Sequence, residues 1–235
     1  MFPLGFFFDR TMFLLLPAMA FAMWAQWKVK STFEEFSRVR ASNGLTGRDM
    51  ARQIMARNGV TDVEIEAVGG QLSDHYDPGT RKVRLSEPIY AGDSISSIAV
   101  AAHEVGHVLQ HHQGYFPLQL RSSMAPAVGF ASTAAMPLFI VGLLLGVRLP
   151  LSGLLMDLGI AFFAGAVLFH IITLPVEFDA SKRALVQLTS TGAVQPQEVA
   201  GAKKVLDAAA LTYVAAAAMA ALQLVRLLVL RNDRR

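Results

Sequence analysis

The stretch Ser94–Gln113, SISSIAVAAHEVGHVLQHHQ, contains the motif that decides the fold and the chemistry of this chain. It is rich in Ala, Val, Ile and Leu, has no proline and is followed by Gly114, so it is predicted to form a helix that ends at a glycine. Inside it, His103 and His107 are four residues apart and therefore lie on one helical face. In an H-E-x-x-H motif both imidazoles can bind one Zn²⁺, and Glu104 faces the water at the open metal position. The stretch predicts the catalytic helix of a zinc peptidase.

A catalytic zinc site needs three protein ligands and an open position, so one ligand must come from elsewhere. A third histidine ten residues after the first is one known solution, but Gln113 occupies that position. His111 and His112 are on the same helix, and successive turns of one straight helix present side chains in a line, so we expect both at a solvated helix end. The chain has no cysteine, which excludes thiolate ligands and disulfides. The remaining option is a carboxylate from a second helix.

Glu177, in the segment LPVEFDAS (174–181), is the best candidate for that carboxylate. Asp179 is the competing ligand, and equally a candidate hydrogen-bond partner for a zinc-bound imidazole. Alternatively, Glu177 is an interfacial acid paired with Lys182 or Arg183. The predicted site has one catalytic residue, Glu104, and three Zn²⁺ ligands: His103, His107 and Glu177.

The composition is that of a membrane protein, with 53% hydrophobic residues and a mean hydropathy of +0.42. A helix needs about 20 apolar residues to cross a bilayer. Four stretches are long enough to span a bilayer: 11–27, 127–147, about 154–174, and 208–225. Soluble core helices are the alternative for the first and the fourth. The first could be a cleaved signal peptide, since Ala18-Met19-Ala20 fits the cleavage pattern. The apolar run continues to Trp24 and Trp27, as in an interfacial aromatic belt, which favours an uncleaved anchor.

The polar region between the first two stretches has helix and strand patterns. A helical pattern opens at Thr46 and closes at 58–59, and residues 60–68 alternate as in a half-buried strand. Residues 74–79 are dense in turn formers, and 81–85 alternate again. We expect 81–85 to be an edge strand that pairs with an extended substrate; the alternative is a plain hairpin that supports the metal helix.

These patterns predict an α+β, mostly helical integral membrane protein with a zincin-like H-E-x-x-H helix, a small β-hairpin and about four transmembrane helices. The expected segments are an anchor at 1–27, a zincin-like domain at 28–126, a transmembrane hairpin at 127–174, a helix carrying the third ligand at 175–207, and a transmembrane helix with a basic tail at 208–235. Pro175 is expected to open the ligand-bearing helix.

The net charge of +3 does not indicate nucleic-acid binding, because the basic residues cluster near the ends of the apolar stretches. With four spans, one side of the membrane holds the H-E-x-x-H helix and most of these basic residues: Lys28, Lys30, Arg38, Arg40, Arg121, Lys182, Arg183, Lys203 and Lys204. The other side holds Arg10, Arg148, Arg231, Arg234 and Arg235. The positive-inside rule predicts a cytoplasmic catalytic side. The expected partners are the bilayer and a protein or peptide substrate.

The stretches at 46–60, 72–87, 174–185 and around the motif carry a resemblance to a known family. The chain resembles the YugP-like membrane neutral zinc metallopeptidases, which implies a multi-pass, zinc-dependent peptidase with His103 and His107 as ligands and Glu104 as catalytic glutamate. It is more distantly similar to the HtpX and CAAX prenyl endopeptidases, in which the glutamate matching Glu177 is the third ligand. In that wider pattern an aspartate follows the E-F-x-A run, whereas this chain has Ser181.

The function that follows is gluzincin-like peptide hydrolysis, with Glu104 as general base. Four residues are candidates for oxyanion stabilisation: His75, Tyr76, Arg183 and Tyr213. Asp157 and His170 are ionisable residues within the third apolar stretch, but neither is expected to act in catalysis. The alternatives are a zinc-binding membrane scaffold or adaptor without turnover, and a transporter. A scaffold has no need for Glu104, and the sequence shows no inverted repeat that would favour a transporter.

Overall fold

The computed structural model describes residues 10–70, 73–146, 149–190, 192 and 194–233. The chain divides into two compact units. The sheet-containing unit comprises Ala25–Gln119 and Pro175–Thr212, and the helical unit comprises Met1–Trp24, Leu120–Leu174 and Tyr213–Arg235. Of the residues named above, Leu72, Arg148, Arg234 and Arg235 lie outside the described residues.

The sheet has three strands, β1 (Glu64–Val68), β2 (His75–Asp77) and β3 (Lys82–Ser86), in the order β1-β3-β2. β3 pairs in parallel with β1 and antiparallel with β2, with Val83 opposite both Ile65 and Tyr76. The prediction that 81–85 forms an edge strand is therefore wrong, because β3 is the central strand. Alternation predicts a strand but not which strands lie beside it. β2 has only three residues and lies within the turn-forming stretch 74–79, so the sequence predicted a turn there instead of a strand. The two edge strands are β1 and β2, and β2 contacts α4.

Three helices complete this part of the sheet-containing unit: α2 (Gly47–Arg57), α3 (Glu87–Tyr90) and α4 (Ile95–His112). α2 begins at a capping box in which Thr46 accepts from the Asp49 amide and Asp49 accepts from the Thr46 amide. The Ser94 side chain caps α4, and Gly114 follows its end with φ +65°. Both predicted helices are confirmed, and the short helix α3 is an additional element that the sequence pattern did not predict.

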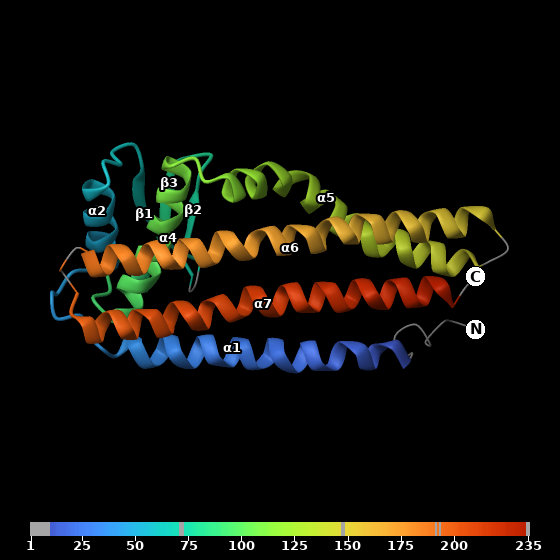
Figure 1. Cartoon of the computed structure of the whole chain (residues 1–235), viewed down its shortest axis with the longest axis horizontal. Coiled ribbons are helices and arrows are strands. Elements are labelled where there is room, and N and C mark those ends of the chain that lie inside the picture. The colour runs from blue at the N-terminus through green and yellow to red at the C-terminus, as the bar shows by residue number, and fades with distance from the viewer. Residues whose placement is uncertain (1–9, 71–72, 147–148, 191, 193, 234–235) are drawn as a thin grey trace. The chain divides into compact units, whose positions relative to one another are not determined.

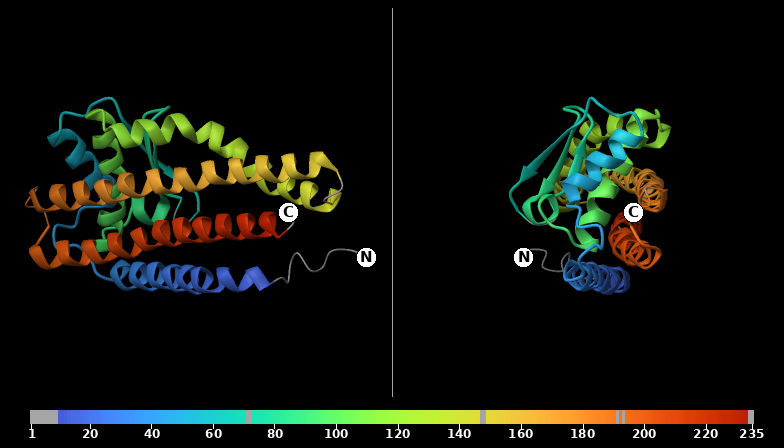
Figure 2. Two further views of the ribbon diagram at one scale, coloured as in Figure 1. Left: turned by 45° about the vertical axis from the view of Figure 1, so that its right-hand side comes forward. Right: turned by 90° about the vertical axis from the view of Figure 1, so that its left-hand side faces the viewer.

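The hydrophobic core of the sheet-containing unit lies between the sheet, α2 and α4, which Figures 1 and 2 show packed together. Its fully buried side chains include Met50, Ile54, Val83, Leu85, Ile89, Ile98 and Leu188. Leu188 brings the C-terminal part of α6 into this core. The core thus holds α4 in place from several sides.

Four long helices supply residues to both units: α1 (Leu16–Ser37), α5 (Phe116–Leu145), α6 (Pro150–Ser190) and α7 (Pro196–Asn232). A short 3₁₀ helix, η2 (Arg10–Leu15), precedes α1. These four helical stretches are long and apolar enough to cross a membrane. The expected fold class, a mostly helical membrane protein with a small sheet, is confirmed.

Pro175 does not open a helix but lies inside α6, which runs unbroken from Pro150 to Ser190. An internal proline removes one backbone hydrogen bond and costs about 3 kcal/mol in an isolated helix. Tertiary packing outweighs this preference here, because the neighbouring Val176, Glu177 and Ala180 are all buried. The third ligand candidate therefore belongs to a helix that continues directly from an apolar segment.

The helical unit packs around Phe139, Met156 and Leu227. A Cβ on Gly142 would lie 2.7 Å from the Ser152 carbonyl oxygen, and one on Gly159 would lie 2.7 Å from that of Ala135, so α5 and α6 pack backbone to backbone. Asp157 pairs with Arg231 at 2.7 Å, which gives this acid a structural role.

Candidate active site

Three side chains from α4 and α6 converge at one point of the sheet-containing unit. The Nε2 atoms of His103 and His107 lie 3.3 and 3.5 Å from Oε2 of Glu177. Glu177 is 2% exposed and His107 is 8% exposed, so the group is shielded from solvent. Among the described residues, this is the one group of three His, Asp or Glu side chains that could hold a metal ion.

The second ring nitrogen of each histidine has its own partner. His103 Nδ1 lies 3.1 Å from the Ser181 hydroxyl, and His107 Nδ1 lies 3.0 Å from the Gln110 side-chain oxygen. An amide oxygen can only accept, so His107 carries its proton on Nδ1 and keeps the Nε2 lone pair for a ligand. These contacts turn the Nε2 atoms of both rings toward Glu177.

Gln110 is itself fixed in place. It is fully buried, and its amide nitrogen donates to the Val176 carbonyl at 2.7 Å and to Asp179 at 2.9 Å. Asp179 in turn accepts from Arg183. The structure therefore places Asp179 beside Gln110 rather than among the three converging side chains. A hydrogen-bonded chain runs from α6 to the His107 ring.

The donor set fits a zinc ion. Two ligands at about 2.0–2.1 Å from Zn²⁺ with a tetrahedral angle between them lie about 3.3–3.4 Å apart. The two distances between imidazole nitrogen and carboxylate oxygen agree with this separation. Two neutral imidazoles and one carboxylate are also a ligand set that catalytic zinc sites use.

Glu104 is buried next to this group. Burial raises the pKa of its carboxyl to about 7; the nearby Glu177 and Asp74 also raise it, and His103 and a hydrogen bond with the Tyr76 backbone lower it. Tyr76 is the middle residue of β2, so the Glu104 carboxylate contacts the edge strand. A carboxyl with a pKa close to neutral pH is suited to exchange a proton during catalysis.

The two helices that carry the three converging side chains touch through their backbones. A Cβ on Gly106 would lie 2.4 Å from the carbonyl oxygen of Ala180. The glycine therefore allows the α6 backbone to approach α4 between the two histidines. The contact lies between the two histidines on α4 and between Glu177 and Ser181 on α6.

The other residues singled out in the sequence are placed as follows. The Tyr76 hydroxyl bonds to His111 Nδ1 at 2.7 Å, so His111 is tied to β2, while His112 is exposed as expected. His75 is exposed, and its Nδ1 lies near the Ser73 carbonyl. Arg183 bonds to Asp179 and Gln113 and stacks on Tyr115. Tyr213 and His170 belong to the helical unit. These contacts assign none of them to an oxyanion site.

Sequence reasoning missed Gln110 and did not assign a contact to Ser181. Both were detectable in part, because Gln110 is one helical turn after His107 and Ser181 one turn after Glu177. Which polar neighbour meets which imidazole depends on how α4 crosses α6, and spacing alone does not reveal that.

Comparison with known proteins agrees with this geometry. The family described as "Putative neutral zinc metallopeptidase" matches residues 11–232. The chain is 53% identical over 214 residues to a protein of Bacillus subtilis (strain 168) described as "Putative membrane protease YugP", which covers 91% of this chain and 93% of that protein. No solved structure matches the chain.

Proposed function

The chain belongs to the "Putative neutral zinc metallopeptidase" family, and from this premise we propose that it is an integral-membrane zinc endopeptidase. The proposed ligands are His103, His107 and Glu177, and the proposed catalytic residue is Glu104. The observation that carries the proposal is the convergence of both imidazole Nε2 atoms on one carboxylate oxygen, at 3.3 and 3.5 Å.

The residues of the chain have separable tasks in this mechanism. When bound, the zinc ion supplies Lewis-acid chemistry that activates a water molecule and polarises the scissile carbonyl. Glu104 takes the proton of the attacking water and delivers it to the leaving amine. Gln110 and Ser181 hold the two imidazoles with Nε2 toward the site, so the donors need no reorganisation.

The substrate backbone is proposed to bind along the free edge of β2. β2 is one of the two edge strands of the described sheet, and it is favoured over β1 because its Tyr76 backbone contacts Glu104. A peptide added as a fourth strand would bring a backbone amide next to the general base. This edge replaces the 81–85 segment that the sequence suggested.

The active site is proposed to face the cytoplasm and to act on membrane or unfolded proteins. The support is the charge asymmetry, because most of the Lys and Arg residues close to the ends of the apolar stretches fall on the expected catalytic side.

Three purified proteins test the proposal: wild type, Glu104→Ala and Glu177→Ala, each in detergent. Bound zinc is measured by elemental analysis, and cleavage is measured on casein as an unfolded protein. We expect Glu104→Ala to keep its zinc and to cleave about 10²–10⁴-fold more slowly, and Glu177→Ala to lose zinc. If wild type binds zinc but cleaves casein no faster than Glu104→Ala does, the result would favour a zinc-binding scaffold without turnover. Full zinc in Glu177→Ala would contradict the proposed ligand set.

A further inference from the structure

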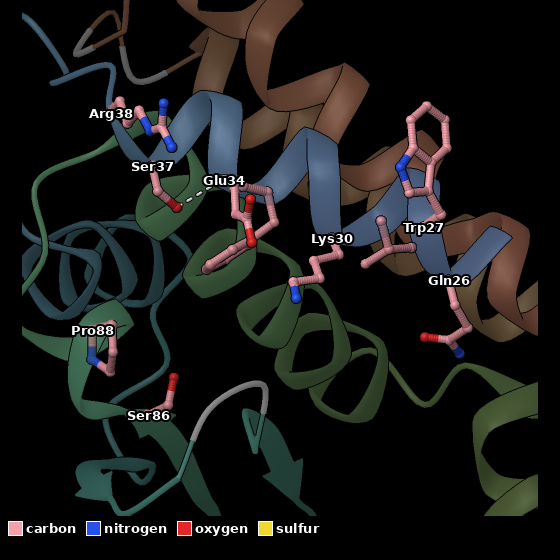
Figure 3. A pocket seen from close by; sticks show the side chains of 10 residues that line it. Gln26, Trp27, Lys30, Glu34, Ser37, Arg38, Ser86 and Pro88 are labelled. Carbon is pink, nitrogen blue, oxygen red and sulfur yellow. Dashed lines mark hydrogen bonds between the residues drawn. The ribbon is translucent and has the colours of Figure 1, made fainter. Parts of the chain in front are cut away.

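A groove of about 760 Å³ lies in the sheet-containing unit between α1 and the segment where β3 leads into α3. One wall is a single face of α1, and the other comes from the start of α3 and the end of β3. Its lining residues are Gln26, Trp27, Val29, Lys30, Phe33, Glu34, Ser37, Arg38, Ser86 and Pro88. Figure 3 shows Lys30 extending from α1 toward the side on which Ser86 and Pro88 lie.

The α1 wall is fixed to the unit that carries the proposed active site. The Ser96 hydroxyl of α4 donates to the Phe33 carbonyl at 2.9 Å, and the Ile95 amide donates to the Val39 carbonyl at 2.9 Å. Thr32 is only 3% exposed. This part of α1 is therefore held against α4, the helix that carries the two histidines.

The strand register gives the distance from the groove to Glu104. Glu104 contacts the Tyr76 backbone, and Tyr76 pairs with Val83 on β3. Ser86 is three residues beyond Val83, which is about 10 Å along a strand. Asp74, which immediately precedes β2, accepts from the Ser86 amide at 2.7 Å and so keeps the end of β3 beside the start of β2. The groove thus lies about three strand residues from the general base.

The strand direction says which part of a substrate reaches the groove. Antiparallel pairing is the more stable and more frequent arrangement, so a peptide on the edge of β2 runs in the same direction as β3. β3 runs toward Ser86 and α3. A peptide lying this way passes Glu104 first and the groove afterwards. The residues that meet the groove are those on the C-terminal side of the cleaved bond.

The side chains of the groove indicate the chemistry of that residue. Trp27 and Phe33 offer apolar contacts, and Lys30 and Arg38 are exposed cations that pair with none of the described residues. Glu34 is the single acid among the described lining residues. The charge balance favours an acidic side chain that lays its methylene carbons on the aromatic rings.

We propose that this groove is a specificity subsite that binds an acidic side chain about three residues after the cleaved bond, with Lys30 as the principal charge partner. The inference rests on the proposed peptidase function and deepens it. A negatively charged lipid headgroup is the competing occupant, because the same cations could bind it.

The test compares cleavage sites in a peptide library made from a digested proteome. Wild type and Glu104→Ala are compared first, then Lys30→Glu with Lys28→Glu as matched control. The Lys28→Glu substitution makes the same charge change two residues away on α1, and Lys28 is not among the residues that line the groove. All four proteins should retain bound zinc.

We expect wild type to favour Asp or Glu over Lys at about the third position after the cut by roughly 1.5-fold to fivefold, which is the range of an exposed charge pair. Lys30→Glu should abolish or reverse this preference, and Lys28→Glu should leave it. An identical profile in wild type and Lys30→Glu would overturn the inference, as would an acidic preference before the cut. If Lys30→Glu changes only the stimulation of cleavage by phosphatidylglycerol in nanodiscs, the groove binds lipid, and this result would also overturn the inference. Failure of the peptidase function itself would appear separately, as equal cleavage by wild type and Glu104→Ala.

Discussion

Replacing Gly106 with alanine should separate the two helices that carry the proposed zinc ligands. The new Cβ would lie 2.4 Å from the Ala180 carbonyl oxygen and 3.0 Å from its carbonyl carbon. Both atoms are backbone, so no side-chain rotation can relieve the contact. Because ordinary contacts begin at 3.4 Å, α6 must retreat from α4 by about 1 Å.

This displacement of α6 from α4 should lower the free energy of unfolding and the zinc affinity by different amounts. Overpacking costs about 1–3 kcal/mol, and alanine regains about 1 kcal/mol of helix propensity, so the net loss of stability is about 0–2 kcal/mol. The distances from Nε2 to Oε2, now 3.3 and 3.5 Å, would grow to roughly 4 Å, beyond what one tetrahedral ion spans. Disturbing a single supporting contact of a zinc ligand costs about 10–100-fold in affinity, and we expect at least that loss here.

Competition with a chromophoric zinc chelator measures the affinity, and thermal unfolding in the presence of excess chelator measures the stability of the metal-free protein. Gly165→Ala is the control, since Gly165 is also helical and its Cβ would meet nothing within 4 Å. It should keep wild-type affinity and gain up to about 1 kcal/mol. Zinc affinity of Gly106→Ala within twofold of wild type would refute the argument that this close approach sets the distance between ligands.

Three further predictions concern other parts of the sheet-containing unit. Gln110→Met fills a similar volume but cannot accept from His107, so zinc affinity should fall about 10–100-fold in chelator competition, with unchanged affinity as the contrary result. Thr46→Ala removes the α2 capping box and should cost about 0.5–2 kcal/mol at neutral pH in chemical denaturation. Because the Thr46 hydroxyl lowers the pKa of Asp49, that difference should shrink as pH falls below about 4; a difference that does not change with pH would contradict this. In metal-free protein, burial raises the pKa of Glu104 to about 7, so the folded state binds more protons than the unfolded state between about pH 4.3 and 7. Glu104→Gln should therefore be more stable than wild type by a margin that grows with pH up to about 7, and thermal unfolding that shows no such growth would contradict the burial argument.

The sequence predicted the elements whose signals are local. The helix around His103 and His107, the capping box at Thr46 and the apolar helices follow from spacing, caps and hydropathy. Glu177 could be singled out because a carboxylate had to complete the ligand set without cysteine. The structure brings it within reach of both imidazoles.

The missed features depend on contacts between segments that are distant in the sequence. β2 is recognisable as an edge strand only once its pairing with β3 is known, and its three residues resemble a turn. A proline usually kinks or breaks an isolated helix, but at Pro175 tertiary packing overrides that preference and α6 continues. The contact of Gln110 with both His107 and Asp179 exists because Gly106 lets α6 approach α4, and no single segment encodes that approach.

The division of the proposed ligands between α4 and α6 has a consequence for biosynthesis. Glu177 follows His107 by 70 residues, and α5 with most of α6 lies between them. A ribosome therefore adds both histidines and the proposed general base long before it adds the third proposed donor. Until residue 177 has been synthesised the nascent chain lacks one of the three proposed donors, and any product truncated before that residue lacks it too. A growing chain therefore gains the complete proposed donor set only after α5 and most of α6 have been made.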